Sequence, residues 1–149
     1  MCDYSLMSVP NRLAREDEDL VCHRFEAGTV GLASCADLEA EADRKRAAQN
    51  SFWTILKAIL VGETGSVPAV CIPPGARLFV MDIPERLRNE IGVGRAEEVT
   101  FTQITAAPHA YRDAVRFRNG REILLQRLEE GQRVHVLALV PERDPEYAA

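Results

Sequence analysis

The 149-residue sequence lacks a long hydrophobic run, since strongly apolar stretches such as Ala58–Val61 are short. A helix that crosses a bilayer needs ~20 apolar residues, so we expect no membrane span. The start of the chain, Met1–Pro10, also lacks the basic residues and the apolar core of a secretory signal peptide. Together these absences predict a cytoplasmic protein.

An excess of basic charge is missing too. The formal net charge is -5 at pH 7, and arginines are mixed with acids in segments such as 15–20 and 84–90. A surface that binds nucleic-acid phosphates needs a basic excess, so we expect no nucleic-acid partner. Nothing in the composition specifies a small-molecule ligand.

Closely spaced cysteine pairs are also absent. The four cysteines stand at positions 2, 22, 35 and 71, without a C-x-x-C pair. In a cytoplasmic chain with a hydrophobic core, this spacing predicts free thiols rather than a disulfide framework. Repeats, low-complexity tracts and linkers are missing as well. The 46% hydrophobic fraction therefore predicts one globular domain over residues 1–149.

What the sequence does contain is a series of short strand patterns. Alternating apolar and polar residues predict strands over 19–25 and 97–104, with a returning strand over 30–34. Two further strands are expected around the turn Pro73–Gly75, and a last one over 133–140. With one long helix, these strands predict an α+β fold, either a small antiparallel β-barrel or a strongly bent sheet that the helix closes.

The predicted hairpin near the C-terminus has a register that can be argued. A three-residue loop over 118–120 pairs Val115 with Ile123. The same loop pairs Arg116 with Glu122, so apolar meets apolar and opposite charges meet. A two-residue turn would pair an apolar side chain with a charged one. We therefore predict the three-residue loop, with its glycine in the left-handed conformation.

The segment Asp37–Val61 predicts the long helix, because it is rich in alanine, leucine, glutamate, lysine and arginine. Asp37 is the expected N-cap, with Ser34 as the rival. An apolar stripe repeats at helical spacing, namely Phe52, Ile55, Leu56, Ile59 and Leu60. We expect Ile55 and Ile59 to pack on the sheet, and Phe52 and Trp53 to reach a second copy in a homodimer.

Other segments are simpler to interpret. Residues 1–18 predict an extended arm, and the proline-interrupted tail 141–149 is expected to be frayed. A short helix is expected from Pro84, at its first position, to just before Gly92.

Cys2 is the first candidate for chemistry. If the initiator methionine is removed, its thiol lies beside the free α-amine, which can act as a base for the side chain. Cys2 would then be a nucleophile or a metal ligand. The alternative interpretation is a cysteine that packs as a small apolar residue.

The adjacent Cys22 and His23 resemble a ligand pair, but neighbouring side chains of a strand point to opposite faces. At most one of them is expected to be a ligand. Cys35 stands at the start of the predicted helix, where the helix dipole is expected to lower its pKa. An unreactive thiol near the helix start is the alternative. His135, among valines in the last strand, is expected to be a cross-strand or edge residue.

The segment 108–113 places a histidine and a carboxylate close together. Pro108 is expected to start a loop or a single helical turn, which would put His109 and Asp113 on one face. A carboxylate beside an imidazole fixes its tautomer and raises its basicity. A surface histidine with an incidental neighbour is the alternative. Cys71, in a predicted buried strand, would by itself be a core residue.

Four stretches of this chain carry a resemblance: MCDYSL at 1–6, NRLA at 11–14, AVCIPPG at 69–75, and the long run PHAYRDAVRFRNGREILLQRLEEGQRVHVL at 108–137. They are similar to a set of small uncharacterised bacterial proteins that begin with the same hexapeptide. The resemblance covers about residues 1–35 and most of the chain after Ala69.

The resemblance implies kinship and no reaction. It singles out Cys2, Cys71, His109 and Asp113 as shared polar positions, whereas Cys22, His23 and Cys35 lie outside the shared pattern.

These observations lead to a hypothesis with two alternatives. The hypothesis is a small cytoplasmic binding protein in which Cys2, Cys71 and His109 hold a zinc, iron or copper(I) ion, with Asp113 orienting His109. The first alternative is a thiol-dependent enzyme, with Cys2 as nucleophile, His109 as base and Asp113 orienting that base. The second is a non-catalytic interaction module that uses the long helix.

Overall fold

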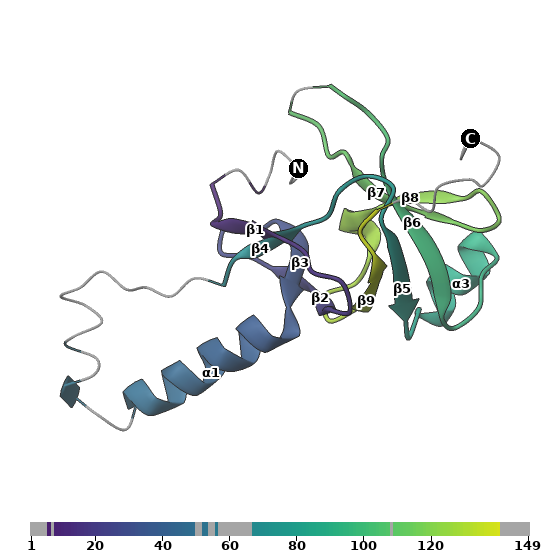
Figure 1. Ribbon diagram of the computed structural model, residues 1–149. Coiled ribbons are helices and arrows are strands. Elements are labelled where there is room, and N and C mark those ends of the chain that lie inside the picture. Colours follow the sequence, from purple (N-terminus) through teal and green to yellow (C-terminus); the bar gives the residue numbers. More distant parts are fainter. Residues whose placement is uncertain are drawn as a thin grey trace.

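The computed structural model describes residues 6, 8–49, 52, 53, 56, 67–107 and 109–140. Two helices are among the elements described, α1 (Cys35–Gln49) and α3 (Glu85–Ile91), together with the short 3-10 helix η2 (Leu125–Arg127). Figure 1 shows strands β1 and β4 side by side, apart from the main sheet. The strands are β1 (Asn11–Leu13), β2 (Asp19–Arg24), β3 (Val30–Ser34), β4 (Ala69–Cys71), β5 (Arg77–Met81), β6 (Glu97–Gln103), β7 (Asp113–Phe117), β8 (Glu122–Leu124) and β9 (Arg133–Ala138).

The main sheet has seven strands in the order β3-β2-β9-β5-β6-β7-β8, and its pairings are antiparallel. This confirms the α+β class with a mostly antiparallel sheet. Within the described residues the sheet is open, with β3 and β8 at its ends, so a closed barrel is not confirmed. Gln126 Nε2 donates a hydrogen bond to the Val30 carbonyl at 2.6 Å. The turn after β8 therefore lies against the opposite edge, as expected for a bent sheet.

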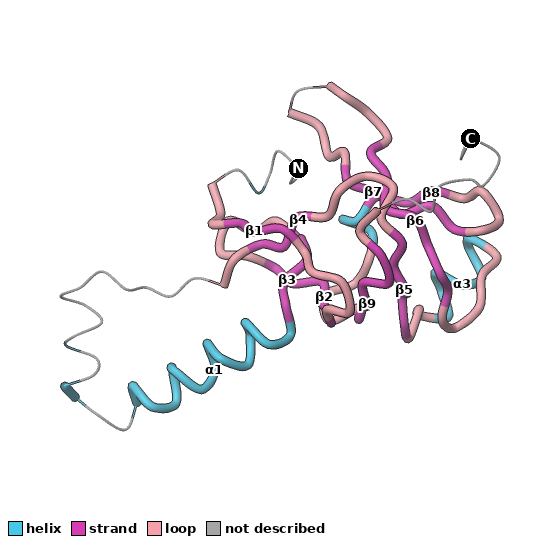
Figure 2. Tube along the Cα trace, in the orientation of Figure 1, coloured by secondary structure: helices cyan, strands magenta, loops and turns pink. Residues whose placement is uncertain are grey.

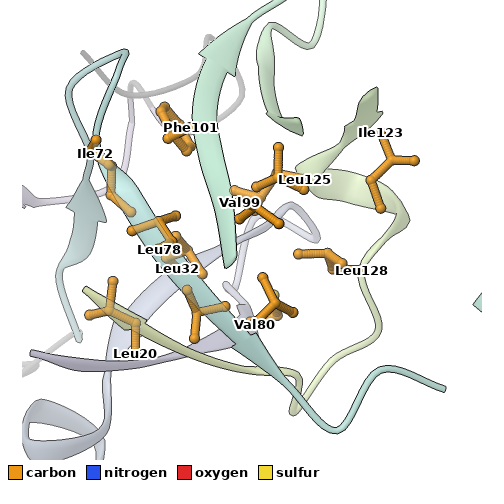
Figure 3. Close-up of a cluster of buried hydrophobic side chains, with 14 of the residues drawn as sticks. Leu20, Leu32, Ile72, Leu78, Val80, Val99, Phe101, Ile123, Leu125 and Leu128 are labelled. Atoms are coloured by element: carbon orange, nitrogen blue, oxygen red, sulfur yellow. The ribbon is translucent and has the colours of Figure 1, made fainter. Parts of the chain in front are cut away.

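Alternation within the strands explains the core. In β5 the residues Leu78 and Val80 are buried, and in β9 the same holds for Val134 and Val136. His135 lies on the other face of β9, as the sequence predicted. Figure 3 shows the resulting cluster, in which apolar side chains from β2, β3, β5, β6 and η2 converge. Burial of this apolar surface is the main source of stability.

The hairpin β7–β8 has the predicted register. Val115 pairs with Ile123 and Arg116 with Glu122. Gly120 has a φ of 84°, the left-handed conformation that the three-residue loop requires. The Arg116 Nε also donates to Glu122 Oε1 at 2.6 Å. Local pairing rules were therefore sufficient to place these strands.

The strands β4 and β5 on either side of Pro73–Gly75 were predicted, but they do not pair with each other. β4 pairs in parallel with β1, whereas β5 pairs with β6 and β9. The turn lies against Phe101, because Gly75 N donates to the Phe101 carbonyl at 2.8 Å and Phe101 N donates to Ala76 at 2.8 Å. This turn therefore connects two sheets instead of closing a hairpin.

The helix expected over Asp37–Val61 begins earlier, and the continuous helix α1 is shorter. It starts at Cys35, directly after β3, and ends at Gln49 (Figure 2). Asp37 is not the N-cap; it lies in the first turn and pairs with Arg12 at 2.9 Å. Phe52, Trp53 and Leu56 are also helical, and all are exposed. The predicted packing of Ile55, Ile59 and Leu60, and the frayed tail 141–149, lie outside the described residues.

The second predicted helix, α3, is confirmed with one difference. Pro84 immediately precedes the helix with extended backbone angles instead of occupying its first position. Gly92 ends the helix in the left-handed conformation with a φ of 71°, as expected.

Candidate functional site

Cys71 is the last residue of β4, and its side chain is only 6% exposed. It is disulfide-bonded, so the expectation that all four cysteines are free thiols is wrong. Its backbone is held by the N-terminal arm, since Ala14 N donates to the Cys71 carbonyl at 2.9 Å. Sequence spacing could not show this bond, because a disulfide depends on the distance between two residues in space.

Asp113 is the first residue of β7, and it is the most deeply buried acid of the described chain at 4% exposure. Its Oδ1 accepts a hydrogen bond from Gln103 Nε2 at 3.2 Å, and the two residues are register partners across β6 and β7. A buried carboxylate is costly unless it is hydrogen-bonded. The Gln103 amide therefore offsets part of that cost.

His109 lies in the loop between β6 and β7, with a φ of 61°. The loop is closed at its base by a hydrogen bond from Ile104 N to the Arg112 carbonyl at 3.0 Å. The residues from His109 to Arg112 are not helical, so the helical turn considered for this segment is wrong and the loop is confirmed. Asp113 is the first residue of strand β7, so His109 and Asp113 do not share a helix face.

Three of the predicted site residues lie on different elements, since Cys71 belongs to the two-stranded sheet, His109 to the loop between β6 and β7, and Asp113 to β7. The turn that follows Cys71 is hydrogen-bonded to Phe101 of β6. This strand ends at Gln103, two residues after Phe101, and the Gln103 side chain donates a hydrogen bond to Asp113. In Figure 1 the segment after β4 passes beside the ends of β6 and β7, where the loop of His109 also begins. The fourth predicted residue, Cys2, lies outside the described residues.

The described residues alone do not form a metal centre. Among them, no group of three or more histidine, cysteine, aspartate or glutamate side chains is arranged to hold an ion. A site built on Cys71 and His109 would therefore need a further ligand, and the disulfide at Cys71 would have to be reduced, since metals bind the thiolate.

Cys22 and His23 point to opposite faces of β2, as strand geometry predicted. The Cys22 thiol is buried, and this burial raises its pKa to about 12. His23 lies on the outer face, where its ring meets Phe25 edge-on with 5.0 Å between the centroids. Cys22 is therefore a core residue that stays protonated at neutral pH, and the two side chains cannot readily reach one ion.

Cys35 begins α1, but the pKa shift expected from the helix dipole is wrong in direction. Burial raises the pKa of this thiol, and the nearby Asp19 carboxylate raises it further. The charge of Arg133 lowers the pKa of Cys35, but by less than burial and Asp19 raise it. Cys35 is therefore no activated nucleophile.

His135 is a cross-strand residue, as predicted, but its partner was not foreseen. It pairs in register with Asp19 of β2, and its Nδ1 lies 2.8 Å from Asp19 Oδ1. The Asp17 carboxylate lies 3.7 Å from Nε2. The two strands are far apart in the sequence, so no local pattern could have indicated this pair.

Arg12 forms a second cluster that the sequence did not reveal. Its guanidinium donates to Glu18 and, at 3.1 and 2.9 Å, to Asp37 in the first turn of α1. Burial alone would raise the pKa of Glu18, but hydrogen bonds from Arg12 and from the Arg15 backbone hold it below its usual value. The cluster joins the N-terminal arm to the start of the helix.

A hollow of about 570 Å³ lies between α1, the arm and the turn after β2. Its size is typical of small-molecule pockets. Lys45 and Glu41, both on its wall, already pair with each other at 2.9 Å. Its lining mixes apolar residues with both signs of charge, namely Val9, Pro10, Phe25, Leu38, Val67, Arg24, Glu26, Glu41 and Lys45. This mixture specifies no single ligand chemistry.

No protein-family model matches the chain, and neither a curated protein nor a solved structure matches it significantly. Among the helices that the structure describes, none is long and apolar enough to cross a membrane.

Proposed function

We propose that this chain is a small cytoplasmic binding protein that holds a zinc, iron or copper(I) ion through Cys2, Cys71 and His109 in its reduced state. The observation that best supports the proposal is the burial of Cys71 and Asp113, together with the hydrogen bonds that tie the turn after Cys71 to the strand that carries Gln103, the partner of Asp113. Thiolate sulfur and imidazole nitrogen are ligands that suit these ions. Asp113 is assigned the role of orienting His109.

The disulfide at Cys71 would make metal binding depend on redox state. A phosphine attacks one sulfur and breaks the S–S bond, and one water molecule then supplies the oxygen of the phosphine oxide and the two protons that complete the two thiols. The thiols lose their protons when a metal ion binds. Cys22 and Cys35 are free, so Cys2 is the remaining cysteine that we assign as the second sulfur ligand.

We expect protein purified without chelator and without oxygen, in a phosphine reductant, to carry about one metal ion per chain. Cys71→Ser should remove most of this metal, because it replaces a thiolate ligand with a weaker hydroxyl. Cys35→Ser is the matched control, since Cys35 is a free, partly exposed cysteine at the start of α1. Elemental analysis measures the metal, and the intact mass reports whether Met1 is removed.

Two results would contradict the proposal. The first is a reduced wild-type protein that remains metal-free after incubation with zinc, iron and copper(I). The second is a Cys71→Ser variant that keeps as much metal as Cys35→Ser.

A further inference from the structure

The helix α1 stands out because none of its residues is buried. It contacts β2 and β3 at its start and otherwise extends away from the sheet (Figure 1). Helices of this length are marginal in water when nothing packs against them. Its internal ion pairs lie at the surface and add little: Arg46–Asp43 is exposed on both sides, and in Lys45–Glu41 only the glutamate is half-buried. Within the part of the chain that the structure describes, no segment packs along most of the length of the helix.

Charge along α1 is divided into two blocks. The acids all lie in the first part and the bases follow them: Asp37, Glu39, Glu41 and Asp43, then Arg44, Lys45 and Arg46. Two such helices side by side in parallel would place like charges together. Placed antiparallel, each acidic block would lie beside the basic block of the other copy. The charge pattern is thus complementary to itself in one orientation.

The outward face of α1 fits this arrangement. Leu38, Glu41 and Lys45 line the hollow, so they mark the face toward the arm. The other face carries six exposed residues at three- and four-residue spacing, namely Ala36, Glu39, Ala40, Asp43, Arg46 and Ala47. Alanine side chains let two helix backbones approach closely, toward the lower end of the usual 8–10 Å separation. The charged residues on this face can then meet across the contact.

We propose that α1 is an interaction surface for a second copy of this chain, in which two α1 helices pair antiparallel about a twofold axis near Ala42 and Asp43. This axis puts Glu39 opposite Arg46 of the second copy. The two Asp43 side chains lie near the axis, where each is paired with Arg46 of its own helix. A twofold contact of this kind is the commonest form of homodimer.

The aromatic pair after α1 extends the same surface. Phe52 and Trp53 are 74% and 75% exposed, and their rings meet edge-on with 6.3 Å between centroids. They follow Gln49 by three and four residues, so the chain places them within about 14 Å of the end of α1. In an antiparallel pair, that end lies beside the start of the other copy's helix. The aromatic side chains can therefore be covered by the second copy.

A charge-exchange experiment tests the pairing. The first variant, Glu39→Lys with Asp43→Lys, leaves only basic charges on the outward face of α1, and the second, Arg44→Glu with Arg46→Glu, leaves only acidic ones there. We expect wild type to be a dimer by analytical ultracentrifugation, and each variant alone to associate more than about tenfold more weakly, because like charges then face each other. An equimolar mixture of the two variants should form a one-to-one heterodimer.

Three controls keep the result specific. Circular dichroism shows whether each variant keeps its helix. Arg95→Glu changes one charge at an exposed site on the far side of the sheet, and it should leave the dimer intact. Raising the salt concentration should weaken the wild-type dimer, since exposed charges are screened. A wild type that stays monomeric at high concentration, or charge variants that dimerise as well as wild type, would overturn the proposal.

Discussion

Replacing Phe101 with alanine is expected to lower the free energy of unfolding by about 3–5 kcal/mol. Phe101 is only 1% exposed and is among the largest fully buried side chains. Removing its ring leaves a cavity at the point where β6 contacts the turn Pro73–Gly75. Removal of the ring should therefore also weaken the packing of the segment that follows Cys71.

Urea unfolding of the reduced protein, followed by circular dichroism, measures this loss. Phe79→Ala is the matched control, because Phe79 is only half-buried and lies on the opposite face of the neighbouring strand β5. Its expected cost is about 1–2 kcal/mol. Equal losses for the two variants would mean that the core does not lie on the face that carries Phe101.

Zinc is expected to stabilise the reduced protein by about 2.7 kcal/mol when the free ion is at a hundred times its dissociation constant. The gain arises because the folded chain brings together ligands that the unfolded chain holds apart. His109→Gln should lose most of this gain. His135→Gln should keep it, since His135 pairs with Asp19 in another part of the sheet.

The shift of the unfolding midpoint with added zinc measures the effect, and the oxidised protein serves as a second control. With Cys71 in its disulfide, little stabilisation is expected. A zinc effect of equal size in the oxidised and reduced proteins, or one that survives His109→Gln, would show that zinc binds elsewhere.

The parts of the fold that depend on neighbouring residues could be predicted from the sequence. The register of Val115 with Ile123 follows from matching side chains across a short loop, and the end of α3 follows from Gly92. The parallel pairing of Asn11 with Ala69 could not be predicted in this way. It joins segments from different parts of the chain, and its strands are only three residues long.

The same distinction applies to the candidate site. Strand alternation was enough to separate Cys22 from His23, and the burial of Cys71 followed from its apolar neighbours. The pKa of Cys35 was predicted in the wrong direction, because the sequence shows the start of a helix but not burial or the nearby Asp19. Likewise, the extent of α1 depends on what packs against it, which helix-forming residues alone do not reveal.

X-ray absorption at the zinc edge, on the reduced and zinc-loaded protein, tests the proposed metal site most directly. Ligation by Cys2, Cys71 and His109 predicts sulfur neighbours at about 2.3 Å and a nitrogen neighbour at about 2.0–2.1 Å. Cys71→Ser should lower the sulfur contribution, whereas Cys35→Ser should leave it unchanged. A zinc shell made only of oxygen and nitrogen in the wild type, or a sulfur contribution unaffected by Cys71→Ser, would contradict the assignment.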